Sequence, residues 1–406
     1  MHPSRPSSAN PSPGYHWSIF RMLEDGCINE LGILEALTGD TFRFRSHGHH
    51  PSLQRRPDED LDGFPGLPWY LDDLRPEGFL GRAYAVNNTL GLPGDPSIWT
   101  SAHLLRALGE GSAITAGDLL IGTHAVEIAT AALTCPPDQV EASCRDRQYP
   151  VKANAVTRGQ CPNLAPGGER PKFTATVYGP DGRYAALVKF AGYDTEEQQR
   201  WADLLVCEHL ALEVLREAGV SAAESSLIQT DSHTFLEVKR FDRSPDTLGR
   251  RGFVSLLALS SAFVGDNAGW DEAGEQLLAL RWISQDTAIA MARLHAFGRL
   301  IGNTDMHQGN IGFHLVDHGP LPLAPTYDML PMSLAPSRTG VLRATTPIAQ
   351  VAPQRSGQLA HLQWAAPLAV GFWGRVAGSG LMRSRVLADV AGENAERVRE
   401  MGRRFG

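Results

Sequence analysis

The chain has 406 residues, a formal net charge of −8 at pH 7 and 42% hydrophobic residues, which is the composition of an ordinary globular protein. The negative charge argues against a strongly basic surface built for non-specific nucleic-acid binding. No apolar run reaches the length needed to cross a bilayer, and residues 1–14 lack the apolar core of a signal peptide. We therefore expect a cytoplasmic protein with no membrane contact.

Cysteine and lysine usage add two constraints. The five cysteines form no CxxC pair, so we expect reduced thiols and neither a zinc site nor a disulfide framework. Lysine occurs only at Lys152, Lys172, Lys189 and Lys239, while the other basic residues are arginine. A chain so biased toward arginine is expected to keep lysine where a compact ammonium group is needed, which directs attention to this stretch.

The first half of the chain is predicted to hold a disordered tail and one small subdomain. Residues 1–14 are rich in proline and serine. Residues 17–37 indicate a short helix and a strand, and residues 39–45 part of a β-hairpin. Residues 101–134 alternate between helix-like and strand-like runs, and residues 135–150 are typical of a linker.

The second half carries clearer signals. Residues 173–190 form two β-type runs around a Gly-Pro-Asp-Gly turn, which predicts a hairpin. A helix is expected over residues 196–218 and a strand over 233–242. A second long helix over 286–301 should end at Gly302, before a loop and a short strand, and helices should make up most of the remainder.

This order of elements predicts an α+β fold. We divide the chain into a disordered tail at 1–14, an N-terminal subdomain at 15–150, a nucleotide-binding lobe with a Gly-rich loop at 151–245 and a helical catalytic lobe at 246–406.

The strongest local signal is the segment IGNTDMHQGNIGF. It holds Asp305 and, five residues later, Asn310, while Asp328 follows in APTYDML. Phosphoryl transfer needs one carboxylate to meet the attacking hydroxyl, and an amide oxygen with a second carboxylate to hold magnesium. Asp305 is the candidate base, and Asn310 and Asp328 are the candidate metal ligands. His307 positions the loop, contacts substrate or is simply a structural histidine.

A second group of residues lies upstream. Gly167 and Gly168 precede a strand, where a backbone turn can cover phosphates, although an ordinary turn has the same pattern. Lys189 in ALVKF can reach the α- and β-phosphates, and Lys172 is placed beside it as a cofactor-binding residue. Glu208 falls on the apolar stripe of the 196–218 helix. A carboxylate there needs a charged partner, and Lys189 is the one we expect.

The segment FLEVKRFDR completes the set. Its strand leads to Lys239 and Phe241, which can give adenine backbone hydrogen bonds and an aromatic wall. The pair Asp242 and Arg243 has a purely structural interpretation as an alternative.

Together these motifs resemble the HipA-like serine/threonine kinase family, the toxin side of a bacterial toxin–antitoxin type. GGERPKF, ALVKF, VKRFDR, IGNTDMHQGN and PTYDML occur in that family's order. GLPWYLDDLRPEGFLGRAYA and GDLLIG are most similar to its stand-alone members of the YjjJ kind. The resemblance implies a kinase-like fold with a small N-terminal β-containing subdomain, a β-rich nucleotide lobe and a helical C-terminal lobe.

The resemblance also implies chemistry and partners. ATP and Mg²⁺ would be the cofactors, with Asp305 as base, Asn310 and Asp328 on magnesium, Lys189 on phosphate, and Lys239 and Phe241 at the adenine hinge. A protein would be the substrate, and an antitoxin a possible partner. Two departures stand out. There is no serine between Ser143 and Ser221, so the self-inactivation typical of HipA kinases is not expected. The short start leaves little room for a helix-turn-helix, so direct DNA binding is not expected either.

Two rival functions remain open from the sequence. A small-molecule kinase of the aminoglycoside or choline type also has Asp, His and Asn in its catalytic loop. A non-catalytic nucleotide-binding module would keep the fold without transferring phosphate. Phosphorylation of such small molecules, or nucleotide binding without transfer, would favour one or the other.

Overall fold

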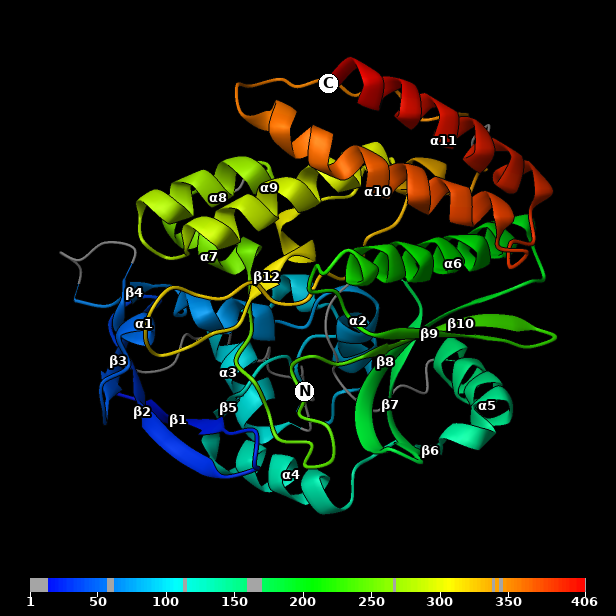
Figure 1. Ribbon diagram of the computed structural model, residues 1–406. Coiled ribbons are helices and arrows are strands. Elements are labelled where there is room, and N and C mark those ends of the chain that lie inside the picture. The colour runs from blue at the N-terminus through cyan, green and yellow to red at the C-terminus, as the bar shows by residue number, and fades with distance from the viewer. Residues whose placement is uncertain are drawn as a thin grey trace, which may run out of the picture.

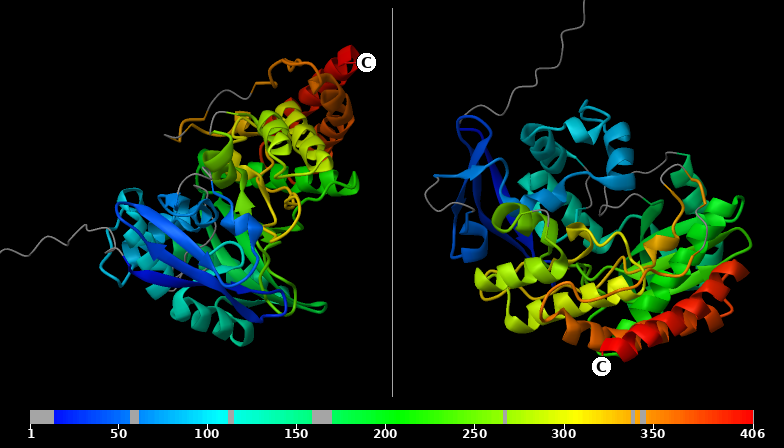
Figure 2. Two further views of the ribbon diagram at one scale, coloured as in Figure 1. Left: turned by 90° about the vertical axis from the view of Figure 1, so that its left-hand side faces the viewer. Right: turned by 90° about the horizontal axis from the view of Figure 1, so that it is seen from above.

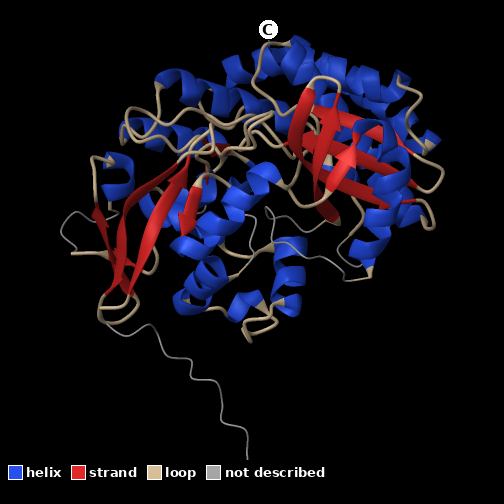
Figure 3. Ribbon diagram, turned by 90° about the horizontal axis from the view of Figure 1, so that it is seen from below, coloured by secondary structure: helices blue, strands red, loops and turns tan. Residues whose placement is uncertain are grey.

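The computed structural model describes residues 14–56, 62–111, 115–158, 170–265, 268–337, 340–342 and 346–405. Two five-stranded sheets lie at opposite sides of the molecule, with helices between and above them (Figure 3). A two-stranded ladder sits nearer the middle. Within the described ranges, no helix combines the length and the apolar character that crossing a membrane requires.

The first sheet has the strand order β4-β3-β2-β1-β5. Its strands are β1 (His16–Met22), β2 (Ile28–Ala36), β3 (Thr41–Ser46), β4 (Phe64–Pro65) and β5 (Leu119–Ile121). The predicted hairpin at residues 39–45 is confirmed, because β3 pairs antiparallel with β2. The short helix expected within residues 17–37 is wrong, because this stretch forms the antiparallel pair β1–β2, in which the register shifts between Ile19 and Phe20.

The short helices of this part of the chain are α1 (Pro51–Gln54), η1 (Trp69–Leu74), α2 (Gly78–Asn87), η2 (Pro96–Ile98), α3 (Ser101–Glu110) and α4 (Gly122–Thr134). Helices α3 and α4 contact β5 of the first sheet, whereas Leu80 of α2 belongs to the core of the second sheet. Thr100 and His103 close a reciprocal cap at the start of α3, which satisfies backbone donors that the first turn leaves open. Figure 1 shows α4 beneath the first sheet, on the side facing the second.

The second sheet has the order β6-β7-β8-β10-β9. Its strands are β6 (Gln139–Glu141), β7 (Lys172–Gly179), β8 (Gly182–Gly192), β9 (Ser225–Gln229) and β10 (His233–Lys239). The predicted hairpin is β7–β8. Residues 135–150, expected as a linker, instead contribute β6, which pairs parallel with β7, the turn η3 (Ala142–Cys144) and the start of α5 (Arg145–Thr157).

Different helices cover the two faces of the second sheet. On one face, Tyr149 of α5 packs with Phe173, Val188 and Phe235 in a small core. On the other face, α6 (Glu196–Glu217) packs against β8 and β10. Helix α10 contacts α6 as well, so most of the α6 side chains are buried. Because side chains alternate along β8, Lys189 projects toward α6 while Val188 projects toward α5.

The C-terminal part is helical. It contains β11 (Val254–Ser255), α7 (Leu256–Phe263), α8 (Trp270–Ala279), α9 (Gln285–Leu300), η4 (Gln308–Asn310), β12 (Gly312–Phe313), η5 (Met332–Leu334), α10 (Gln358–Gly378) and α11 (Arg385–Phe405). Helices α10 and α11 pack as a pair over α6, on the side away from the first sheet (Figures 1 and 2).

The predicted α+β class is confirmed by these elements. The division into domains stays a prediction. It has to accommodate two observations: α5 runs across residue 150, and β6 joins a sheet whose other strands all follow residue 171.

Candidate active site

Lys189 lies on the α6 side of the second sheet, between two carboxylates. Its Nζ donates to both oxygens of Glu208 on α6, at 2.7 and 2.9 Å. It also forms an ion pair with Asp328. Only 8% of Lys189 and 1% of Glu208 is exposed. The structure thus brings together the lysine and glutamate that the sequence suggested as partners, and adds the aspartate from 139 residues further along the chain.

Burial and the neighbouring charges shift the pKa values of this cluster. Burial disfavours a charged ammonium, but Asp328 and Glu208 outweigh it and raise the pKa of Lys189. Burial also disfavours charge on Asp328, yet Lys189 and Lys172 outweigh it and lower the pKa of that carboxyl. Burial raises the pKa of Glu208. Lys172 reaches this cluster because it faces Lys189 across the β7–β8 pair.

Two amide side chains within the loop after α9 form hydrogen bonds with its backbone. Helix α9 gives way at Gly302, whose φ of 72° belongs to the left-handed region that favours glycine. The Oδ1 atom of Asn303 then accepts from the backbone N–H of Asp305 at 3.0 Å. From the other end, Nδ2 of Asn310 donates to the carbonyl of Asp305 at 2.9 Å. Asp305 itself is exposed, so its carboxylate can meet a substrate from solvent.

Side chains from outside hold the same loop in place. Nε1 of Trp270, at the start of α8, donates to the carbonyl of His307 at 3.1 Å. The hydroxyl of Tyr327 donates to the carbonyl of Gly309 at 2.8 Å. Nε2 of Gln308 donates to the carbonyl of Ala268 at 3.0 Å. None of these anchors was predicted, although Gln308 and Tyr327 lie inside the motifs IGNTDMHQGNIGF and PTYDML; Trp270 stands in neither motif.

Asp328 and Asn310 have the atoms that magnesium requires. Asp328 sits at a φ of 52°, an unusual conformation for a residue with a Cβ, and its backbone carbonyl lies 3.5 Å from Nδ2 of Asn303. Because Nδ2 of Asn310 is engaged, its amide oxygen is the atom left to coordinate. One carboxylate and one amide oxygen fit magnesium, which commonly takes its other ligands from water and phosphates.

The remaining predicted residues lie as follows. Nδ1 of His307 accepts from the N–H of Gly309 at 3.0 Å, so its ring closes the turn. The side chain of Lys239 points to the opposite face of the sheet, where Nζ lies 2.7 Å from Glu224. Only the backbone of Lys239 can therefore serve a ligand on the Lys189 side. Gly167 and Gly168 lie outside the described residues.

Phe241 connects the end of β10 to the loop that carries Asp328. Its ring stacks on Tyr327 with centroids 5.8 Å apart, and packs against Phe253 at 5.6 Å. Since Tyr327 precedes Asp328 and holds Gly309, this aromatic group joins the strand end, the Asp328 loop and the Asp305 loop.

Comparison with known proteins places this arrangement in a family. Residues 164–399 match the HipA-like C-terminal domain, and residues 14–130 match the middle domain of YjjJ-like toxins. The chain belongs to the HipA-like family. It is 35% identical over 350 residues to the toxin YjjJ of Escherichia coli K12, covering 85% of this chain and 77% of that protein.

Solved structures support the fold. HipA of Shewanella oneidensis, in a complex with HipB and operator DNA, superposes with a TM-score of 0.56 at 16% identity, over 95% of this chain and 97% of that one. The kinase CtkA of Helicobacter pylori gives a TM-score of 0.42 at 13% identity, which is too low to bear on the fold. The expected HipA-like architecture is therefore confirmed.

Proposed function

We propose that the chain is an ATP- and Mg²⁺-dependent phosphotransferase, namely a serine/threonine protein kinase that acts as a toxin-type growth regulator. The observation that carries this proposal is the buried position of Lys189 between Glu208 and Asp328. An ammonium group fixed by one carboxylate and directed at a second is suited to hold nucleotide phosphates beside a bound magnesium ion.

Each residue has a role in this proposal. Glu208 orients Lys189, whose ammonium group contacts the phosphates. Asp328 and the amide oxygen of Asn310 hold magnesium, which neutralises charge on the transferred phosphoryl group. Asp305 accepts the proton of the attacking hydroxyl. Asn303 sets the backbone position of Asp305, and the backbone near Lys239 and Phe241 receives the adenine.

Partners follow from the relatives. The Shewanella protein forms a complex with HipB and operator DNA, and YjjJ is a toxin. We extend this to a protein partner that restrains the present chain, and to a protein substrate. The charge of −8 makes direct DNA binding by this chain alone an unfavourable alternative.

The test is a phosphorylation assay on the purified protein. The protein is incubated with γ-labelled ATP, magnesium and a bacterial lysate, beside the variants Asp305→Ala, Asp328→Ala and the control Asp231→Ala. Asp231 is an exposed carboxylate on the β9–β10 turn, so its loss should change nothing. Asp305→Ala should abolish labelling but keep ATP binding, since a base acts on the hydroxyl, whereas Asp328→Ala should also weaken magnesium-dependent binding.

Three results would contradict the proposal. Equal loss of ATP binding in both variants would show that the two roles are wrongly assigned. ATP binding by the wild-type protein without any labelled protein band would favour a non-catalytic nucleotide-binding module. Labelling of added aminoglycosides or choline, again without a protein band, would identify a small-molecule kinase.

A further inference from the structure

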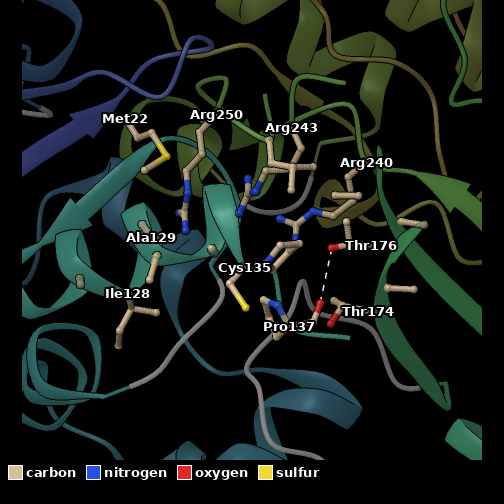
Figure 4. A pocket seen from close by; sticks show the side chains of 18 residues that line it. Met22, Ile128, Ala129, Cys135, Pro137, Thr174, Thr176, Arg240, Arg243 and Arg250 are labelled. Carbon is tan, nitrogen blue, oxygen red and sulfur yellow. Dashed lines mark hydrogen bonds between the residues drawn. The ribbon is translucent and has the colours of Figure 1, made fainter. Parts of the chain in front are cut away.

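A cavity of about 430 Å³ opens between the two halves of the molecule (Figure 4), and neither Lys189 nor Asp328 lines it. Its walls come from α4, from the segment Cys135–Pro137, from the strand pair β7–β8 and from the loop after β10. Pockets for small molecules in proteins have volumes of roughly 300–1,000 Å³. The cavity is therefore large enough for a small organic ligand.

Three arginines form one wall of this cavity. Arg240, Arg243 and Arg250 converge there (Figure 4). All three are nearly buried: the side chain of Arg240 is 5% exposed, and Arg243 and Arg250 are each 7% exposed. Among the described residues that line the cavity, none is acidic.

The positive charge of this wall exceeds its nearest negative charge. Asp242 behind the wall accepts from Arg240 at 2.7 Å and from Arg243 at 2.9 Å. The guanidinium of Arg250 donates to the neutral hydroxyl of Thr115 at 3.2 Å. Asp242 is thus the one carboxylate that is hydrogen-bonded to this wall, and it is bonded to Arg240 and Arg243.

The next carboxylate is already engaged. Asp118 lies 2.8 Å from Nε of Arg21, whose Nη1 also pairs with Asp317 at 2.7 Å. With Arg21 included, four guanidinium groups meet the three carboxylates of Asp242, Asp118 and Asp317, which leaves one positive charge in excess. Buried charge without a partner is costly. In agreement, burial and the neighbouring Arg240 lower the pKa of Arg243 and bring the pKa of Arg250 down to about 10.

The opposite wall is apolar and made of small side chains. It includes Ile128 and Ala129 of α4, while Met22 lies beside Arg250 (Figure 4). The hydroxyls of Thr174 and Thr176 stand at the side. A ligand that fits has an anionic group at the arginine wall and a compact apolar body on α4.

The position of the cavity separates it from the proposed nucleotide site. Ala185, which lines it, is on the same face of β8 as Lys189 but four residues earlier. At about 3.3 Å per residue this places the two roughly 13 Å apart. Arg240 follows the end of β10 directly. An occupant would therefore lie next to the strand end to which we assign the adenine, without touching Lys189.

We propose that this cavity binds a small organic phosphate monoester, with the phosphate on Arg240, Arg243 and Arg250 and an apolar body against α4. A phosphate monoester carries about −1.5 to −2 charges at pH 7, which is enough to offset the excess positive charge of the wall. Arginine also suits phosphate, because its planar group donates two parallel hydrogen bonds. The site goes beyond the proposed kinase activity and does not depend on it.

The test is calorimetric titration of the full chain with phenyl phosphate, and with phenol as the neutral counterpart. Arg250→Met removes one charge at similar length, and Ala132→Phe fills the cavity from α4. The double variant Lys189→Met/Glu208→Gln changes the other site only. Phenyl phosphate should bind the wild type and the double variant equally, and bind Arg250→Met and Ala132→Phe at least tenfold more weakly. Phenol should not bind measurably.

Two results would overturn the proposal. The first is the absence of saturable phenyl phosphate binding to the wild-type chain. The second is phenyl phosphate binding that a folded cavity variant, Arg250→Met or Ala132→Phe, leaves unchanged; loss of that binding in the double variant would then place the phosphate beside Lys189. Circular dichroism of each variant verifies its fold, and since the two cavity variants act from opposite walls, either one that folds decides the question.

Discussion

Replacing Lys189 by methionine should destabilise the protein strongly, and in a way that depends on pH. The change leaves Glu208, which is 1% exposed, buried without the ammonium group that holds both of its oxygens. Removing one partner of a buried ion pair costs about 3–5 kcal/mol. The side chain of Asp328 is 26% exposed, so water can replace its lost partner and its share of the cost is smaller.

The pH dependence follows from Glu208. Burial already raises the pKa of this carboxyl, and the loss of Lys189 raises it further. A buried carboxyl with a raised pKa is protonated in the folded state at low pH, so its penalty is smallest there. Above the ordinary glutamate pKa of about 4.3 the unfolded chain loses this proton while the folded state keeps it, so stability falls as the pH rises, and it levels off above the raised pKa. The destabilisation by Lys189→Met should therefore grow as the pH rises above that ordinary pKa.

A double-mutant cycle measures the pair itself. Urea unfolding of Lys189→Met, Glu208→Gln and the double variant should give a coupling energy of at least about 2 kcal/mol, because a neutral pair leaves no buried charge. Lys152→Met is the matched control: it removes a partly exposed pair with Asp138 at 3.2 Å, and should cost less than about 1 kcal/mol. Additive effects, or a loss from Lys189→Met that does not change with pH, would refute this reasoning.

Two further predictions concern Asp73 and Asn303. Burial raises the pKa of Asp73 to about 6, so this one group should lower the unfolding free energy by about 3 kcal/mol as the pH rises from about 4 to about 6. In urea unfolding the pH profile of Asp73→Asn should differ from that of the wild type by this amount, and parallel profiles would contradict the prediction. Asn303→Ala removes the acceptor that holds the N–H of Asp305, and should lower kcat of phosphate transfer roughly 10- to 100-fold with little change in the KM for ATP. Asn303→Asp keeps that acceptor and should recover part of the rate; equal impairment of both variants would argue against a positioning role.

The parts of the site that follow local periodicity could be predicted from the sequence. Glu208 falls on the apolar stripe of a 22-residue helix, so its burial and its need for a cation follow from helical spacing. Lys189 faces that helix because side chains alternate along β8. The end of α9 at Gly302 follows from the freedom of glycine to adopt positive φ.

The parts set by distant contacts could not be predicted. A short helix was expected within residues 17–37, where the register shift between Ile19 and Phe20 interrupts the alternation that marks a strand. β6 has only three residues, and its pairing with β7 is made across more than 30 residues of chain. The hydrogen bond from Trp270 to His307 spans 37 residues, so no local pattern connects the two.

The placement of the four lysines has a practical consequence for covalent attachment. Lys172 and Lys189 are only 3% and 8% exposed, so among the lysines amine-directed reagents will react mainly at Lys152 and Lys239. Lys152 belongs to α5, and the side chain of Lys239 lies on the same outer face of the second sheet, near Tyr184. Protein immobilised through these two side chains is attached by the surface opposite Lys189, and its Asp305 loop remains accessible to analytes in solution.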